Sequence, residues 1–171
     1  MKISDNWNQH FSIWKFLTLF NNKNDERFLW VFINLHLITK SVFMTNVLPL
    51  IVGGIAGTLL RHGISGWVYN LSGGLFPWGT ITVNMIGSLT IGFLWGFLDV
   101  DHLSSQLKNL LFIGFLGSFT TFSAFSIETL NLARSGEMKL AVLNLLVSNI
   151  GGLVFVFAGF IIGRQLHLFV K

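Results

Sequence analysis

The chain has 171 residues, of which 52% are hydrophobic and only 11% carry a charge. A soluble domain has about 25% charged residues, so this composition excludes an ordinary soluble protein and predicts an all-α integral membrane protein. The absence of cysteine excludes disulfides, thiolate metal sites and cysteine nucleophiles. The net charge of +4 is spread over loops and ends, so we expect contact with the lipid bilayer and no nucleic-acid partner.

Residues 1–43 differ in character from the remainder of the chain. Only 12 uncharged residues, 28–39, separate Arg27 from Lys40, and these are too few to span a bilayer. No small-residue cleavage site typical of a signal peptide follows them. Two interpretations stay open: an interfacial amphipathic extension, or translation that begins at Met44, since residues 44–171 form a complete membrane domain alone.

Four membrane-spanning helices are predicted from the positions of the charged residues. The uncharged stretch 62–98 has 37 residues, which is too long for one crossing, and the turn signals Gly73-Gly74 and Pro77 divide it. Together with the other uncharged stretches, this division predicts helices near 46–68, 77–98, 108–131 and 139–165. Because the loops are short, we expect consecutive helices to be antiparallel neighbours.

Pairs of glycines four residues apart mark the expected contact faces of these helices, because small residues let helix backbones approach closely. The pairs are Gly53/Gly57, Gly92/Gly96 and Gly159/Gly163.

The balance of positive charges predicts how the chain inserts, because cytoplasmic loops carry an excess of Lys and Arg. A chain that starts at Met44 has three such residues on each side of the membrane, and this balance favours neither orientation, so the short form could insert both ways. The extension raises the count on its own side to eight against three, which favours a cytoplasmic N-terminus for the long form.

The centre of the third predicted helix is unusually polar for a membrane span. Residues 109–127 give 19 uncharged positions, close to the ~20 that a crossing needs. Their centre holds the hydroxyl residues Ser118, Thr120, Thr121 and Ser123. Lipid penalises such residues unless they pack against protein or line a polar cavity, so this segment predicts a pathway for a small ion.

Two carboxamides and one serine are further candidates for this pathway. Asn84 lies within the second span, where it either hydrogen-bonds a neighbouring helix or donates to a passing anion. In the fourth span Asn144 and Ser148 share one face at i, i+4, and Gly152 continues that face. We call Asn144, Ser148 and Gly152 the polar track.

Phe122 and Phe125 share a face of the third helix at i, i+3. Ordinary packing explains most such rings. The alternative uses the electropositive ring edge, which can face an anion without a full charge that would trap the ion.

Glu128 is the only acidic residue within the last three predicted helices. We expect an interfacial position or a contact with Arg134 or a neighbouring helix; proton exchange is the alternative. The histidines have no metal-ligand spacing, and no nucleophile–base arrangement is evident, so we do not expect an enzyme.

Three segments together resemble one known family. Residues 53–61 read Gly-Gly-Ile-Ala-Gly-Thr-Leu-Leu-Arg. The second span carries Gly79-Thr80, Asn84, Gly87-Ser88 and Gly92. The third carries Gly114-Phe-Leu-Gly117-Ser-Phe-Thr-Thr-Phe-Ser-Ala-Phe125-Ser and then Glu128. From about Met44 to the C-terminus, and in this order, the chain resembles the Fluc (CrcB) fluoride channel family.

The resemblance implies a fluoride channel of the bacterial inner membrane that exports fluoride passively, as an antiparallel, dual-topology homodimer. Phe122 and Phe125 would be the pore phenylalanines, Asn84 a fluoride-facing donor, and Arg61 an attractor of anions in an aqueous vestibule. The third helix would be broken at mid-membrane. There the backbone carbonyls of Gly117 and Thr120 from both subunits would hold a structural Na⁺.

The chain departs from the family pattern at three positions. Ala124 stands where Thr is usual, Asn144 where Tyr is usual, and Gly152 where Ser is frequent.

Pairing with a non-identical sister chain is a second option for the dimer. The rival function is a small dual-topology, proton-coupled drug antiporter, which predicts a buried carboxylate in the first span; residues 46–60 contain none. A non-conducting assembly subunit is the third.

Overall fold

The computed structural model describes residues 26–170, and these residues form helices joined by short turns. The chain divides between Phe43 and Met44 into two units. In the N-terminal unit, α2 covers Glu26–Val42. The rest of the predicted extension, residues 1–25, lies outside the described residues.

The second unit begins at Met44, inside a π-helical turn that starts at Phe43. This turn, η1, covers Phe43–Val47 and leads into α3, Leu48–Ser72, and α4 then covers Trp78–Phe97. The third segment is built from several short pieces: η2 (Val100–His102), α5 (Ser105–Lys108), the π-helical η3 (Asn109–Leu116), α6 (Gly117–Phe119) and α7 (Phe122–Arg134). The last helix, α8, covers Met138–Val170.

Four helical stretches among the described residues are long and apolar enough to cross a membrane: Trp30–Ser72, Trp78–Phe97, Ser105–Arg134 and Met138–Val170. The prediction of an all-helical protein with four membrane-capable helices is therefore confirmed. The first helix ends where expected from its turn signals. Gly73 adopts the left-handed conformation, with φ 55°, and its N–H donates to the carbonyl of Tyr69 at 3.0 Å.

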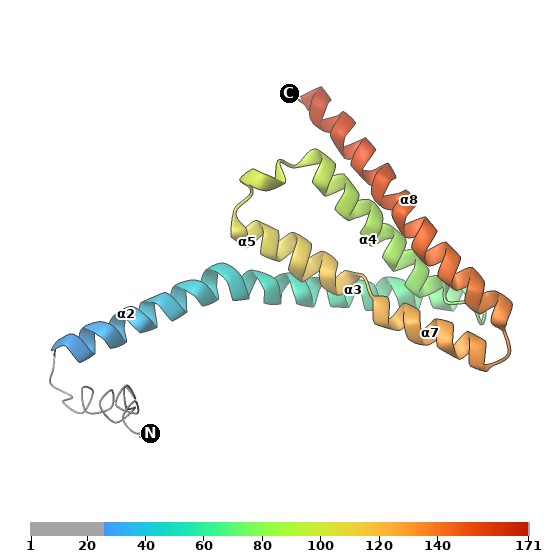
Figure 1. The fold of residues 1–171 in the computed structure, drawn as a ribbon, viewed down its shortest axis with the longest axis horizontal. Coiled ribbons are helices and arrows are strands. Elements are labelled where there is room, and N and C mark those ends of the chain that lie inside the picture. Colours follow the sequence, from blue (N-terminus) through green and yellow to red (C-terminus); the bar gives the residue numbers. More distant parts are fainter. Residues whose placement is uncertain (1–25, 171) are drawn as a thin grey trace, which may run out of the picture. The chain divides into compact units, whose positions relative to one another are not determined.

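Consecutive helices reverse direction, as expected, but the closest backbone contacts join alternate helices (Figure 1). Along α4 and α8, Gly92 and Gly96 lie against the carbonyls of Val156 and Phe160. Gly159 and Gly163 lie in the same way against Leu89 and Phe93.

The first and third segments repeat this arrangement. Gly53 and Gly57 lie against the carbonyls of Leu110 and Phe115 in η3. All three predicted glycine pairs thus lie at close helix contacts. An added Cβ at any of these positions would collide with a neighbouring backbone.

Few large side chains are fully buried in the second unit. Val83 and Phe119 are among them, and they fix α4 and α6 in the interior. Many large apolar side chains of α3 and α8 face outward instead, including Ile55, Phe157 and Ile161. An outward apolar surface of this kind is suited to lipid or to another membrane subunit.

Candidate functional site

Two extended residues separate α6 from α7. Thr120 has φ −85° and ψ 155°, and Thr121 has φ −148° and ψ 117°, so neither continues the helix. The Thr121 hydroxyl accepts the N–H of Ala124 at 3.3 Å, which caps the start of α7. We call these two residues the Thr120–Thr121 link.

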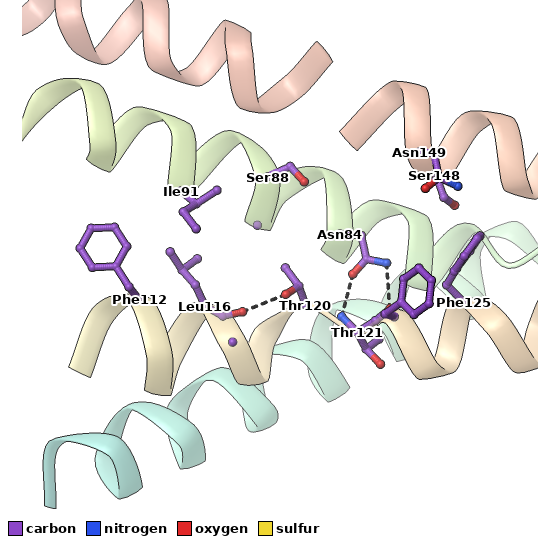
Figure 2. Close-up of a pocket in the computed structure, with 13 residues that line it drawn as sticks. Asn84, Ser88, Ile91, Phe112, Leu116, Thr120, Thr121, Phe125, Ser148 and Asn149 are labelled. Atoms are coloured by element: carbon purple, nitrogen blue, oxygen red, sulfur yellow. Dashed lines mark hydrogen bonds between the residues drawn. The ribbon is translucent and has the colours of Figure 1, made fainter. Parts of the chain in front are cut away.

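Asn84 of α4 holds the link in place. Its Oδ1 accepts the backbone N–H of Thr121 at 2.9 Å, and its Nδ2 donates to the Thr121 carbonyl at 3.2 Å (Figure 2). Of the two interpretations of Asn84, the interhelical hydrogen bond is therefore present. Because an amide nitrogen carries two protons and only one is used here, one N–H is left to act as a donor.

The link also frees two backbone carbonyls. In a continuous helix the Gly117 carbonyl would accept the N–H of Thr121, and the Thr120 carbonyl that of Ala124. Here those donors turn to Asn84 Oδ1 and to the Thr121 hydroxyl. Gly117 is exposed and Thr120 is half-buried. Backbone carbonyls without a helical donor are ligands for a hard cation, so these two groups could hold one.

An open cavity of about 340 Å³ lies at the link, between α4, η3, α7 and α8 (Figure 2). It brings together most of the candidate residues found in the sequence. Its lining residues are Asn84, Gly87, Ser88, Ile91, Phe112, Leu116, Gly117, Thr120, Thr121, Phe122, Phe125, Ser148 and Asn149. The wall therefore combines apolar rings with neutral hydroxyls and carboxamides, and it contains no charged side chain.

Phe122 and Phe125 form one corner of this cavity. Their ring centroids are 5.3 Å apart and the rings are tilted by 51°. Phe125 is 5% exposed and fixed by packing, whereas Phe122 is 75% exposed. Only one of the two rings is therefore held by the contacts of this chain.

The polar track divides into a cavity residue and a buried residue. Ser148 lines the cavity, but Asn144 is 1% exposed and lies between α7 and α8. Asn144 Nδ2 donates to the Thr129 hydroxyl at 2.8 Å, and Asn144 Oδ1 accepts the Ser148 hydroxyl at 3.2 Å. Asn144 therefore does not line the cavity itself. It holds the Ser148 side chain through this hydrogen bond.

Sequence reasoning missed both Thr129 and Asn149. Thr129 lies one helical turn after Phe125, a pore candidate. This spacing was the signal in the sequence that both residues share one side of α7. Asn149 lines the cavity beside Ser148, although it lies off the stripe formed by Asn144 and Ser148.

A second open cavity, of about 840 Å³, contains the other candidates. Arg61 and Ser123 line it together with Thr80 and Glu128, and Thr121 belongs to both cavities. The structure thus separates Arg61 and Ser123 from the two phenylalanines but places them at the other side of the link.

Glu128 contacts a neighbouring helix, as one interpretation of the sequence predicted. Its Oε1 accepts the Thr80 hydroxyl of α4 at 2.6 Å, while its Oε2 is buried without a hydrogen-bond partner among the described residues. The described residues also contain no cluster of three or more His, Asp or Glu side chains that could hold a metal ion.

A family model described as "CrcB-like protein, Camphor Resistance (CrcB)" matches residues 48–160. The chain belongs to the CrcB family. The match covers α3 to α8 up to Phe160, and therefore includes the link and both cavities.

Individual CrcB relatives match over their whole length. A protein of Parabacteroides distasonis is 44% identical over 128 residues, which make up 75% of this chain and 100% of the relative. Proteins of Geotalea uraniireducens and Coxiella burnetii are each 45% identical over 124 residues, covering 72% and 71% of this chain and 100% and 99% of the relatives. All three are named fluoride-specific ion channel FluC. The resemblance found in the sequence is confirmed.

Proposed function

We propose that this chain is a fluoride-selective channel that exports fluoride passively and lowers its cytoplasmic concentration. The observation that carries the proposal is the cavity at the Thr120–Thr121 link, where neutral donors and two aromatic rings surround an open space. CrcB relatives of matching length, named for fluoride, support the choice of ion.

The chemistry of the wall suits a small anion that must leave water. Hydroxyls and the free N–H of Asn84 replace lost hydration, and the ring edges of Phe122 and Phe125 add weak positive potential. The donors make binding of the anion strong enough for entry. Because none of these groups carries a full charge, binding stays weak enough for exit. Arg61 and Ser123 in the second cavity would attract anions toward the link.

We propose that two copies pair in opposite orientations in the bilayer. The open cavity, the 75% exposure of Phe122 and the outward apolar side chains of α3 and α8 support a second subunit that closes the pathway. A homodimer is the simplest arrangement, and a heterodimer with a sister subunit is the alternative outcome of a pull-down with two tags.

We propose further that the link is a helix break at mid-membrane and that it holds a structural Na⁺. The Gly117 and Thr120 carbonyls, relieved of their helical donors, fit such an ion. When bound, Na⁺ supplies positive charge that compensates the free carbonyls. The contribution of this chain is to orient the two carbonyls through the Asn84–Thr121 hydrogen bonds.

The need for such a channel follows from weak-acid chemistry. Hydrogen fluoride crosses membranes in its neutral form, ionises in the more alkaline cytoplasm and is trapped. A passive path in the bacterial inner membrane lets the negative membrane potential expel the anion, at about 2.3 kcal/mol per charge per 100 mV. No nucleotide-binding loop is present in the sequence, and this route requires none.

Fluoride efflux from proteoliposomes, followed with a fluoride electrode, tests the proposal. A channel gives a voltage-driven fluoride leak when valinomycin and K⁺ set the potential, with chloride as the control ion. A proton-coupled uptake of organic cations would instead establish the antiporter. Absence of any transport would indicate a non-conducting subunit and would refute the channel.

A further inference from the structure

Ser88 of α4 lies beside the proposed pathway, one helical turn beyond Asn84. Residues at i and i+4 share one helix face, and both side chains line the cavity at the link. Figure 2 shows Ser88 between Asn84 and Ile91, on the wall that faces α8. It therefore continues a line of polar groups from Asn84 toward the far end of the cavity.

The hydroxyl of Ser88 differs from several other helical hydroxyls of this chain. Thr90, Ser126 and Thr129 each donate to the carbonyl one turn earlier, at 2.8 Å. Ser88 makes no hydrogen bond with any described residue. Its hydroxyl proton is thus not committed to the protein.

The other hydroxyls of the cavity are already engaged. Thr120 donates to the Leu116 carbonyl at 3.0 Å, and Ser148 donates to Asn144 Oδ1 at 3.2 Å. The Thr121 hydroxyl lies 3.3 Å from the Ser123 hydroxyl, and either atom can be the donor in that pair. Among the hydroxyls that line this cavity in the described part of the chain, Ser88 is therefore the one that takes part in no hydrogen bond.

Ser88 lies on the cavity wall and next to α8. Gly152 of α8 faces it, since a Cβ on Gly152 would lie 3.6 Å from Ser88 Oγ. Because Gly152 has no side chain, α8 contributes no hydroxyl at this position of the polar track. At this height the chain carries its hydroxyl on α4 instead.

We infer that Ser88 is an anion-binding residue of the pathway, which donates its hydroxyl proton to fluoride after Asn84. The inference rests on the proposed function. A hydroxyl donating to an anion forms a short, charge-assisted hydrogen bond, and a neutral group does not trap the ion. Asn84 and Ser88, about 6 Å apart along one helix face, provide successive donors.

Ser88→Ala in the full chain tests the inference. Alanine keeps the helix and removes only the hydroxyl, so folding and elution in size-exclusion chromatography should match the wild type. We expect fluoride efflux at low fluoride concentration to fall about tenfold, the effect of losing one hydrogen bond to a charged group. Ser88→Thr, which retains the hydroxyl, should conduct at close to the wild-type rate.

A matched control and a rescue separate binding from structure. Thr90→Val removes a hydroxyl of the same helix that bonds only to its own backbone outside the cavity, and it should leave efflux unchanged. Adding Gly152→Ser to Ser88→Ala returns a hydroxyl to the same space from α8 and should restore much of the flux.

Wild-type efflux from the Ser88→Ala channel, or no recovery in the double variant, would overturn the role of Ser88 while leaving the fluoride channel in place. If the wild-type protein itself carries no fluoride, the proposed function fails and the role of Ser88 fails with it.

Discussion

The carboxamide of Asn84 pairs with the backbone of Thr121 through two hydrogen bonds, of 2.9 Å from the Thr121 N–H and 3.2 Å to its carbonyl. One side chain of α4 thereby satisfies both polar groups of a residue that has left the helix. Unpaired backbone groups inside a membrane cost several kcal/mol each, so this contact allows the Thr120–Thr121 link to exist. Asn84 and Thr121 both line the cavity beside Phe122, so the same contact lies in the wall of that cavity.

Asn84→Asp should disrupt both the link and the pathway. The carboxylate keeps the shape and still accepts the Thr121 N–H, but it cannot donate to the carbonyl and brings negative charge to an anion path. We expect a loss of stability of about 1–3 kcal/mol, measured from the unfolding midpoint in detergent, and loss of fluoride efflux. Wild-type efflux from this variant would contradict the role of Asn84 as a donor.

Phe122→Ile should abolish fluoride efflux while the dimer still forms. The side chain is 75% exposed in the protomer, so its replacement removes few contacts of the fold. Phe125→Ile is the comparison, because Phe125 is 5% exposed and its loss should also lower stability, by about 1–2 kcal/mol. Undiminished efflux from Phe122→Ile would remove the aromatic pore, and size-exclusion chromatography checks the dimer.

Thr129→Val should destabilise the fold through Asn144. The valine is similar in shape but leaves the buried Asn144 Nδ2 without its acceptor at 2.8 Å. We expect a cost of about 1 kcal/mol, measured as a lower unfolding midpoint in detergent. Thr129→Ser keeps the hydroxyl and serves as the control. An equal loss in both variants would mean that the methyl group, not the hydrogen bond, is responsible.

Gly159→Ala should weaken the packing of α8 on α4. An added Cβ would meet the Leu89 carbonyl, a backbone atom that cannot move alone, so the two helices must separate. A cost of about 1–3 kcal/mol is expected. Gly63→Ala is the matched control, because nothing lies within 4 Å of the added Cβ and alanine favours the helix. Equal stability of the two variants would contradict the glycine contact.

Removal of Na⁺ should lower fluoride efflux if the Gly117 and Thr120 carbonyls hold the ion. The protein is purified and reconstituted with a large organic cation in place of Na⁺, and efflux is then compared with that of a sample returned to Na⁺. Flux that is equal in strictly Na⁺-free preparations would count against the central cation.

The sequence alone determined the four helices, because uncharged stretches and turn residues are local properties of the chain. It also determined the contact glycines, since a four-residue spacing places two small residues on one helix face whatever that face meets. The third-helix segment 114–125, together with the segments of the first and second spans, carried the resemblance to the CrcB family. Each of these conclusions depends on residues that are close together along the chain.

The tertiary structure decided what each face meets. Asn144 and Ser148 share a face of α8, yet Asn144 is buried on Thr129 while Ser148 lines the cavity. Likewise, the packing assigned Arg61 to a different cavity from Phe122, and it brought Ser88 opposite Gly152. Helical periodicity gives the direction of a side chain, but its partner comes from a segment far away in sequence, which only the packing of α4, α7 and α8 specifies.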